Sequence, residues 1–125
     1  MPSRSHSEIA TEFLQLAASG RAREAFERHV TPGFRHHNPW FQGDGPSLMK
    51  AMDENAAQNP DKQMTIHRVV EGGDQVATYS HVSQKKGERG AAVVHIFRFE
   101  ADRIAELWDV GQEVPADSPN QNGMF

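Results

Sequence analysis

Residues 91–111, AAVVHIFRFEADRIAELWDVG, decide the fold of this chain. Apolar and polar residues alternate along both halves of the stretch, and Ala101-Asp102 separates the halves. Alternation with a period of two is typical of a strand that buries one face, and a short break between two such runs is typical of a hairpin. The stretch therefore predicts two antiparallel strands, over residues 91–100 and 103–111.

The register of this hairpin decides which side chains share a face. A three-residue loop at residues 101–103 would place His95 opposite Asp109. Two apolar pairs would share their face: Phe97 with Leu107, and Phe99 with Ala105. A two-residue turn would shift the pairing by one residue and separate His95 from Asp109. With the first register, we expect an imidazole and a carboxylate within reach of each other in an apolar cavity.

Two further runs of strand character precede the hairpin. Residues 63–70 and 75–84 are rich in β-branched residues, and residues 71–74, EGGD, separate them. The polar segment 85–90, KKGERG, leads to the first strand of the hairpin. Four consecutive strands with short connections predict an antiparallel meander.

The first half of the chain has helical patterns instead. Ser5-His6-Ser7-Glu8 has the form of a capping box and opens a pattern over residues 7–18. A second pattern spans residues 21–29 and ends at the turn signal Thr31-Pro32-Gly33, after which residues 34–40 look extended. A third helix begins near Pro46 and ends at Asn59-Pro60. Helices followed by strands predict an α+β fold, in which three N-terminal helices pack on one face of a curved antiparallel sheet.

The composition limits the possible functions. The chain has 125 residues, enough for one domain, and we expect an irregular tail from about residue 112 whose last residues, Met124 and Phe125, dock on a surface. Thirteen Lys and Arg against seventeen Asp and Glu give a net charge of −4, which disfavours a nucleic-acid partner. The chain has no cysteine and no glycine loop of the ATP or NAD type, so we expect no cofactor. We find no signal peptide and no membrane span, and expect a cytoplasmic protein.

The order of the predicted elements resembles the NTF2-like cone fold, and several motifs look like its SnoaL-like branch of polyketide cyclases and aldol-condensation enzymes. The resemblance covers nearly the whole chain. The motifs that carry it are FRHHNP (34–39), IHRVV (66–70), SHV (80–82), VVHIFR (93–98), ELWDV (106–110) and NGMF (122–125).

The resemblance implies a catalytic pair. In SnoaL-like cyclases an acidic residue on the final strand acts as acid and base with a histidine on the preceding strand, and Asp109 and His95 match those places. Burial raises the pKa of a carboxyl group and a nearby imidazolium lowers it, so either group could titrate near neutral pH. The alternative to catalysis is a structural role, in which the buried histidine and aspartate only satisfy each other's hydrogen-bonding groups.

Other polar and aromatic residues are candidates for substrate binding. In an extended segment at most one of His36 and His37 can enter a cavity, and the resemblance favours His37, with Asn38 bonding a ligand oxygen. The remaining candidates are Trp40 with Phe41 as a hydrophobic lid, Tyr79, His81 and Phe97, with His67 a weaker one. If a metal binds at all, we expect its ligands to be His37, His81 and His95, although no local ligand spacing supports it.

We therefore predict a small cofactor-independent enzyme for aldol cyclisation, isomerisation or dehydration of a small apolar carbonyl compound. The alternatives are a non-catalytic module that binds a small hydrophobic ligand, and a metal-dependent enzyme that uses the histidines. Three short helices cover only one face of the sheet, so the other face, with Val94 and Ile96, needs a cover. The resemblance implies dimers formed sheet to sheet, and we expect a homodimer.

Overall fold

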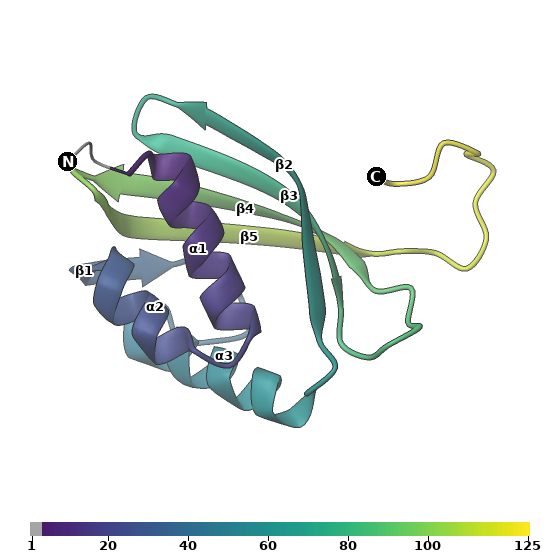
Figure 1. Cartoon of the computed structure of the whole chain (residues 1–125), viewed down its shortest axis with the longest axis horizontal. Coiled ribbons are helices and arrows are strands. Elements are labelled where there is room, and N and C mark those ends of the chain that lie inside the picture. Colours follow the sequence, from purple (N-terminus) through teal and green to yellow (C-terminus); the bar gives the residue numbers. More distant parts are fainter. Residues whose placement is uncertain (1–3) are drawn as a thin grey trace.

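Three helices cover one face of a curved sheet of five strands in this computed structural model, which describes residues 4–125 (Figure 1). The helices are α1 (His6–Ala18), α2 (Ala22–His29) and α3 (Gly45–Gln58). The strands are β1 (Val30–His36), β2 (Gln63–Gly72), β3 (Gln75–Ser83), β4 (Ala91–Glu100) and β5 (Arg103–Glu113). The α+β class, the three N-terminal helices and the four-stranded meander β2 to β5 are confirmed.

The helices begin where the sequence provides a cap. The Ser5 side chain accepts a hydrogen bond from the Glu8 backbone N–H, and the Glu8 carboxylate accepts one from the Ser5 N–H, which completes the predicted capping box of α1. At α3 the Asp44 carboxylate accepts a hydrogen bond from the Ser47 N–H, with Pro46 in the first turn. Such caps satisfy backbone donors that a helix start leaves unpaired.

The predicted sheet lacked one strand and was wrong in being entirely antiparallel. The strand order is β1-β5-β4-β3-β2, and β1 runs parallel to β5 at the edge of the sheet. Thr31-Pro32-Gly33 has the form of a turn in the sequence but lies within β1, where the pairing is irregular between Val30 and Arg35. An edge strand tolerates proline because one side of it needs no ladder partner.

The hairpin β4–β5 reaches the predicted pairing by another route. Its turn contains only two residues, because Glu100 pairs with Arg103, and Ala101 adopts a positive φ of 51° there. The register then shifts by one between Arg98 and Phe99, so Phe99 pairs with Ile104, not with Ala105 as predicted. This bulge restores the register further along, where Phe97 pairs with Leu107 and His95 with Asp109.

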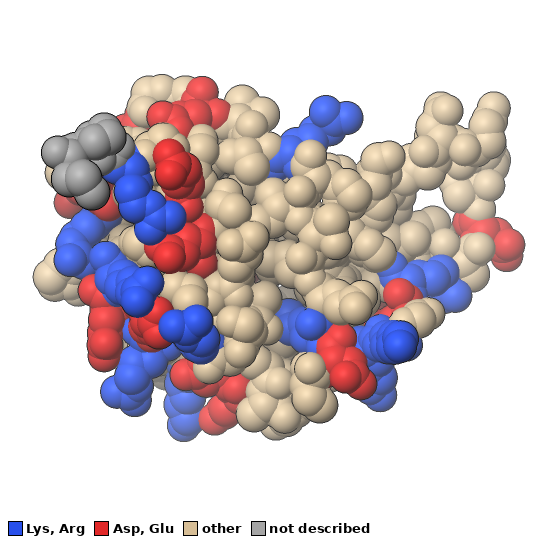
Figure 2. Space-filling model, viewed as in Figure 1, with Lys and Arg blue, Asp and Glu red and all other residues tan. Residues whose placement is uncertain are grey.

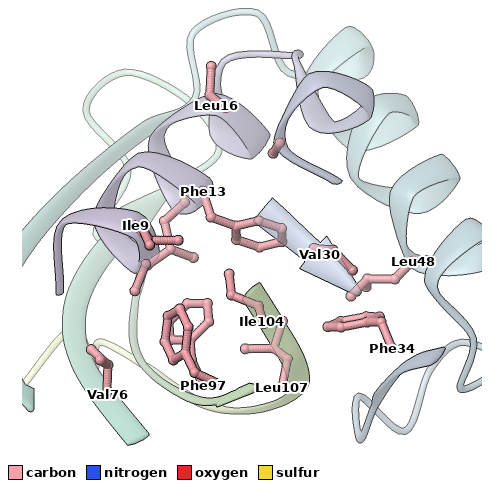
Figure 3. Close-up of a cluster of buried hydrophobic side chains, with 14 residues drawn as sticks. Ile9, Phe13, Leu16, Val30, Phe34, Leu48, Val76, Phe97, Ile104 and Leu107 are labelled. Atoms are coloured by element: carbon pink, nitrogen blue, oxygen red, sulfur yellow. The ribbon is translucent and has the colours of Figure 1, made fainter. Parts of the chain in front are cut away.

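The hydrophobic core lies between the helices and the inner face of the sheet (Figure 3). The ring of Phe13 from α1 meets that of Phe97 from β4 edge to face, with centroids 5.9 Å apart. Ile104 and Leu107 from β5 are also fully buried in this cluster. Phe97 is part of this packing and does not line a cavity, which corrects the expectation that it binds substrate.

The last residues of the chain return to the outer face of the sheet. Residues 114–125 form no helix or strand and turn back beyond the end of β5 (Figure 1). The Tyr79 hydroxyl donates a hydrogen bond of 2.6 Å to the Met124 carbonyl, and the Phe125 ring contacts Tyr79, His81 and His67. The predicted docking of the tail is confirmed.

Acidic and basic side chains are intermingled over the helices on the face shown in Figure 2. Several of them form ion pairs, such as Arg4 with Glu12 and Arg28 with Glu24. Among the described residues, no helix is long and apolar enough to cross a membrane.

Candidate functional site

A cavity of about 270 Å³ lies between the helices and one end of the sheet. Most of its wall is apolar, and the larger apolar residues are Leu14, Phe41, Leu48, Met52, Met64, Val82 and Val93. A few polar side chains interrupt that wall: Asn38, Asn55, Lys62, Gln84, His95 and Asp109. An apolar cavity with a few convergent polar groups is the usual form of a small-molecule site.

His95 lies on β4 at the wall of this cavity and is 7% exposed. Burial lowers its pKa to about 4, the nearby Asp109 carboxylate acts in the opposite direction, and the Lys62 charge lowers it further. The imidazole is therefore neutral at neutral pH, with one nitrogen that donates and one that accepts. Its Nδ1 is buried and has no hydrogen-bond partner within the described residues.

Asp109 lies directly opposite His95 in the β4–β5 ladder and lines the same cavity. It is half-buried, and its Oδ2 accepts a hydrogen bond of 3.1 Å from the Asn38 side-chain amide. Asn38 follows the end of β1, so the parallel β1–β5 pair brings this amide to the carboxylate. The two predicted catalytic residues and Asn38 thus meet in one place.

Asn38 is itself held by its neighbours. Its backbone N–H donates to His36 Nδ1 at 3.1 Å, and its side-chain oxygen accepts from the Trp40 N–H at 3.0 Å. Because Nδ1 accepts, His36 carries its proton on Nε2, which donates to the Gln42 carbonyl. The buried His36 therefore positions Asn38 and, through it, Asp109.

His37, which the resemblance favoured, points to the other side of the sheet. Its Nε2 bonds Glu106 Oε2 at 2.6 Å, and its ring stacks on Trp108 with centroids 4.9 Å apart. Glu106 also accepts hydrogen bonds from Arg35 and Arg98, and these partners hold its pKa down at about 2. Neighbouring side chains of an extended segment point to opposite faces, so burial of His36 turns His37 outward.

Tyr79 and His81 also lie on the outer face, which corrects the expectation that they line the cavity. The β3–β4 register pairs Thr78 with His95 and therefore turns Thr78 and Ser80 inward. His81 Nε2 bonds the Arg89 carbonyl at 2.6 Å, and its ring packs against Phe125. The outward faces of Tyr79 and His81 bind the tail instead.

The expected aromatic lid is only half present. Trp40 is 83% exposed and does not line the cavity, whereas the neighbouring Phe41 does. His67 stacks on Phe125 on the outer face.

Three polar residues of the cavity had not been expected: Asn55, Lys62 and Gln84. Lys62 Nζ donates a hydrogen bond of 2.7 Å to Asn55 Oδ1, and burial lowers the pKa of Lys62. Gln84 follows β3, and its Oε1 is buried without a hydrogen-bond partner in the described part of the chain. All three lie at element ends or on a helix, with no local motif, so nothing in the sequence singled them out.

The three histidines proposed as metal ligands do not converge. His95 faces the cavity, whereas His37 and His81 lie on the opposite face of the sheet with partners of their own. Across residues 4–125, no group of three or more histidine and carboxylate side chains could hold a metal ion. The arrangement that remains in the cavity is a carboxylate beside a neutral imidazole in apolar surroundings, which suits proton transfer.

Solved structures with similar folds share little sequence with this chain. Wild-type IdmH from Streptomyces antibioticus, described as a candidate polyketide cyclase, matches with a TM-score of 0.71 at 18% identity, over 86% of this chain and 92% of that one. A candidate polyketide cyclase from Acidithiobacillus ferrooxidans matches with a TM-score of 0.68 at 19% identity, over 89% and 91%. A candidate isomerase of the SnoaL-like family from Agrobacterium tumefaciens gives 0.71 at 14% identity, over 86% and 97%.

Among curated protein sequences, none matches this chain. The model of the SnoaL-like domain family matches residues 10–107, which is most of the sequence; the match includes His95 and residues 103–107 of β5 and ends before Asp109. Because this family model covers well over half of the sequence, we conclude that this chain belongs to the SnoaL-like domain family.

Proposed function

We propose that this protein is a small-molecule enzyme that moves protons on a carbonyl compound, in an aldol cyclisation, an isomerisation or a dehydration, without a cofactor. One observation carries the proposal: His95 and Asp109 lie opposite each other and line one largely apolar cavity. Solved relatives of the same fold described as polyketide cyclases and as an isomerase support this reaction class.

Asp109 acts as the base in this mechanism. Its carboxylate takes a proton from the carbon next to the substrate carbonyl; the C–H electron pair forms the enolate, whose negative charge collects on the carbonyl oxygen. The Asn38 amide fixes the orientation of the carboxylate through Oδ2. In an isomerisation, the proton returns from Asp109 to another carbon of the enolate system. In a cyclisation, the enolate carbon forms a bond to a second carbonyl carbon of the substrate, the π pair of that carbonyl moves to its oxygen, and Asp109 protonates the resulting alkoxide. In a dehydration, the enolate expels a hydroxyl group from the β-carbon, which takes the proton from Asp109 and leaves as water.

His95 assists at the oxygen. A neutral imidazole keeps one N–H donor, and a donor in a cavity of low polarity stabilises a developing oxyanion more than it would in water. Since burial lowers the pKa of His95 to about 4, the imidazole donates a hydrogen bond at neutral pH and does not need to transfer its proton.

The size of the cavity favours a small substrate. Pockets that bind drug-sized ligands usually measure roughly 300–1,000 Å³, and this cavity of about 270 Å³ lies just below that range. A compound with one or two rings fits such a space better than a long polyketide chain.

Exchange of substrate hydrogen for deuterium in heavy water tests the proposal without knowledge of the natural substrate. A panel of small enolisable ketones is incubated with the protein, and uptake of deuterium at the carbon next to the carbonyl is followed by NMR. Asp109→Asn should slow the exchange by about 10²-fold or more, the scale of a positioned acid or base. Asp117→Asn, in the exposed tail, is the matched control.

A second candidate function is binding without catalysis, which the mostly apolar lining of the cavity would also allow. The same panel separates the two. A ketone that binds equally well to the wild-type protein and to Asp109→Asn, with no exchange in either, would favour the binding module.

The homodimer is also part of the proposal. The outer face of the sheet carries Ile96 and Trp108, both partly exposed, and Val110, which is 70% exposed. An apolar sheet face of this kind is a natural surface for a second copy of the chain. Light scattering should give a mass near twice the 14.0 kDa of one chain, and a mass of one chain at tens of micromolar would refute the dimer.

The cytoplasmic location stays a prediction.

A further inference from the structure

Lys62 is the one basic side chain other than His95 among the described residues that line the cavity. It lies between α3 and β2, directly before Gln63, and is partly buried. Its Nζ donates a hydrogen bond of 2.7 Å to Asn55 Oδ1 on α3, which holds the ammonium group near the cavity wall. The side chain is therefore fixed in place and not free in solution.

The ammonium group of Lys62 has a neutral partner only. Among the described residues, no carboxylate lies within ion-pair distance of its Nζ, whereas the exposed Lys50 on α3 pairs with Glu54. Burial lowers the pKa of Lys62, and its charge in turn lowers the pKa of His95 across the cavity. A partly buried charge without a counter-charge is costly, and an anion bound beside it would remove much of that cost.

A second polar group lies at the same end of the cavity. Gln63 and Ser83 form the terminal pair of the β2–β3 ladder, so Lys62 and Gln84 each lie one residue beyond that pair. Gln84 also lines the cavity, and its buried Oε1 is an acceptor without a partner in the described residues. A carboxylate has no hydrogen to donate to that oxygen, so only the Nε2 donor of the Gln84 amide can bind a carboxylate together with the charge of Lys62.

The two charged ends of the cavity are separated by the strand order. Asp109 lies on β5 and Lys62 beside β2, with β4 and β3 between them. The anionic end of a substrate is repelled by Asp109 and attracted to Lys62. The substrate therefore binds with this end at Lys62. Its far end then reaches His95 and Asp109.

We infer that the cavity takes a small carbonyl compound that carries a carboxylate, with the carboxylate bound by Lys62 and the carbonyl end directed to His95 and Asp109. The direction of the carbonyl end rests on the proposed function, but the binding of the carboxylate by Lys62 does not. Lys62 is thus the residue that selects an acidic substrate over its neutral analogues.

A matched pair of probes tests the inference: 3-benzoylpropanoate, a keto acid, and 3-benzoylpropanamide, its neutral amide of the same size. Dissociation constants are measured by calorimetry at pH 7 for the wild-type protein, Lys62→Met, Lys62→Arg and Asp109→Asn. Lys50→Met is the control, because its exposed side chain does not line the cavity. Lys62→Met keeps nearly the length of the side chain and removes the charge.

The wild-type protein and Lys50→Met should bind the acid about tenfold or more tightly than the amide, the scale of a hydrogen bond to a charged group. Lys62→Met should lose this preference while its affinity for the amide stays the same, and Lys62→Arg should retain part of it. Asp109→Asn should keep the preference even if it abolishes hydrogen exchange, so a failure of the proposed catalysis can be told apart from a failure of this inference. An undiminished preference in Lys62→Met, or equal or undetectable binding of both probes to the wild-type protein, would overturn it.

A folding control guards against a trivial loss of binding. The pKa of Lys62 is lowered by burial, so Lys62→Met, which replaces the charge with a neutral side chain, should leave the midpoint of urea unfolding unchanged or raised. In the wild-type protein the acid probe should also shift the NMR signal of the Lys62 Cε methylene group, whereas the amide should not. A shift of equal size with both probes would contradict the ion pair.

Discussion

His95 lies directly opposite Asp109 in the β4–β5 ladder because one residue, Ala105, is left without a partner. The two-residue turn at Ala101-Asp102 alone would have placed the two side chains out of register by one position. The bulge beside Phe99 shifts the register back before the cavity is reached. A local irregularity 10 Å or so along the strand, about three residues at ~3.3 Å each, therefore decides whether the pair exists.

Protonation of His95 should make stability depend on pH. Burial lowers the pKa of His95 from 6.5 to about 4, so between these values the unfolded chain binds a proton that the folded chain does not. The contribution of His95 to the free energy of unfolding should therefore fall by up to about 3 kcal/mol as the pH decreases from about 6.5 towards 4, and should then level off. Urea unfolding of wild-type and His95→Gln protein at several pH values measures it.

In that experiment the difference in unfolding free energy between the two proteins should shrink as the pH falls. His67→Gln is the control for the loss of an imidazole outside the cavity, because His67 lies on the outer face against Phe125. A wild-type minus His95→Gln difference that is constant from pH 7 to pH 4 would mean that the imidazole is not kept neutral by burial.

Asn38→Ala should lower turnover without removing the base. The amide of Asn38 donates to Asp109 Oδ2, so its loss frees the carboxylate to rotate and leaves it more hydrated. We expect about a tenfold loss of the hydrogen-exchange rate, smaller than that of Asp109→Asn, because outer groups that orient a catalytic residue typically contribute about 10–100-fold. An exchange rate equal to that of the wild type would show that the amide does not orient Asp109.

Glu106→Gln should destabilise the protein in a pH-dependent way. Arg35, His37 and Arg98 hold the pKa of Glu106 at about 2, so the carboxylate stabilises the fold above about pH 4.5 and this contribution is lost as the pH falls towards 2. At pH 7 we expect Glu106→Gln to lower the free energy of unfolding by about 1–2 kcal/mol. The effect is modest because Arg35 is largely exposed, and solvent weakens its ion pair with Glu106.

The cost of Glu106→Gln should become smaller at pH 3.5, where much of the unfolded chain is already protonated at this position. Glu100→Gln, which loses only an exposed contact with Arg98, is the matched control and should cost about 0.5 kcal/mol or less. Equal costs for the two variants at pH 7 would argue against a stabilising network around Glu106.

Phe97→Ala and Phe125→Ala should differ strongly in stability. Phe97 is fully buried against Phe13, so its loss leaves a cavity in the core and should cost about 3–5 kcal/mol in unfolding free energy. Phe125 is 42% exposed, and its ring packs against those of His67, Tyr79 and His81 on the outer face, so its loss should cost about 1 kcal/mol or less in unfolding free energy. Urea unfolding compares the two, and a small cost for Phe97→Ala would contradict its place in the core.

Much of the fold could be predicted because its signals are local. The capping box at Ser5 and Glu8 and the proline at position 46 mark helix starts within a few residues of chain, and alternation with a period of two marks β2 to β5. The pairing of His95 with Asp109 was one of the two registers that the sequence allowed, but the structure reaches it through a two-residue turn followed by a bulge, which no local signal indicated. The SnoaL-like motifs then indicated the family that the comparisons show.

Contacts between distant segments decided the rest. β1 contains Pro32 and Gly33 and becomes a strand only because the edge of β5 supplies its hydrogen bonds. The loop of residues 84–90 does not define the β3–β4 register, so the sequence could not tell that Thr78 faces inward beside His95 while Tyr79 and His81 face the tail. Lys62 could not be identified from the sequence as a cavity residue. The cavity forms only where side chains from several elements come together, and no spacing along the chain indicates which residues do so.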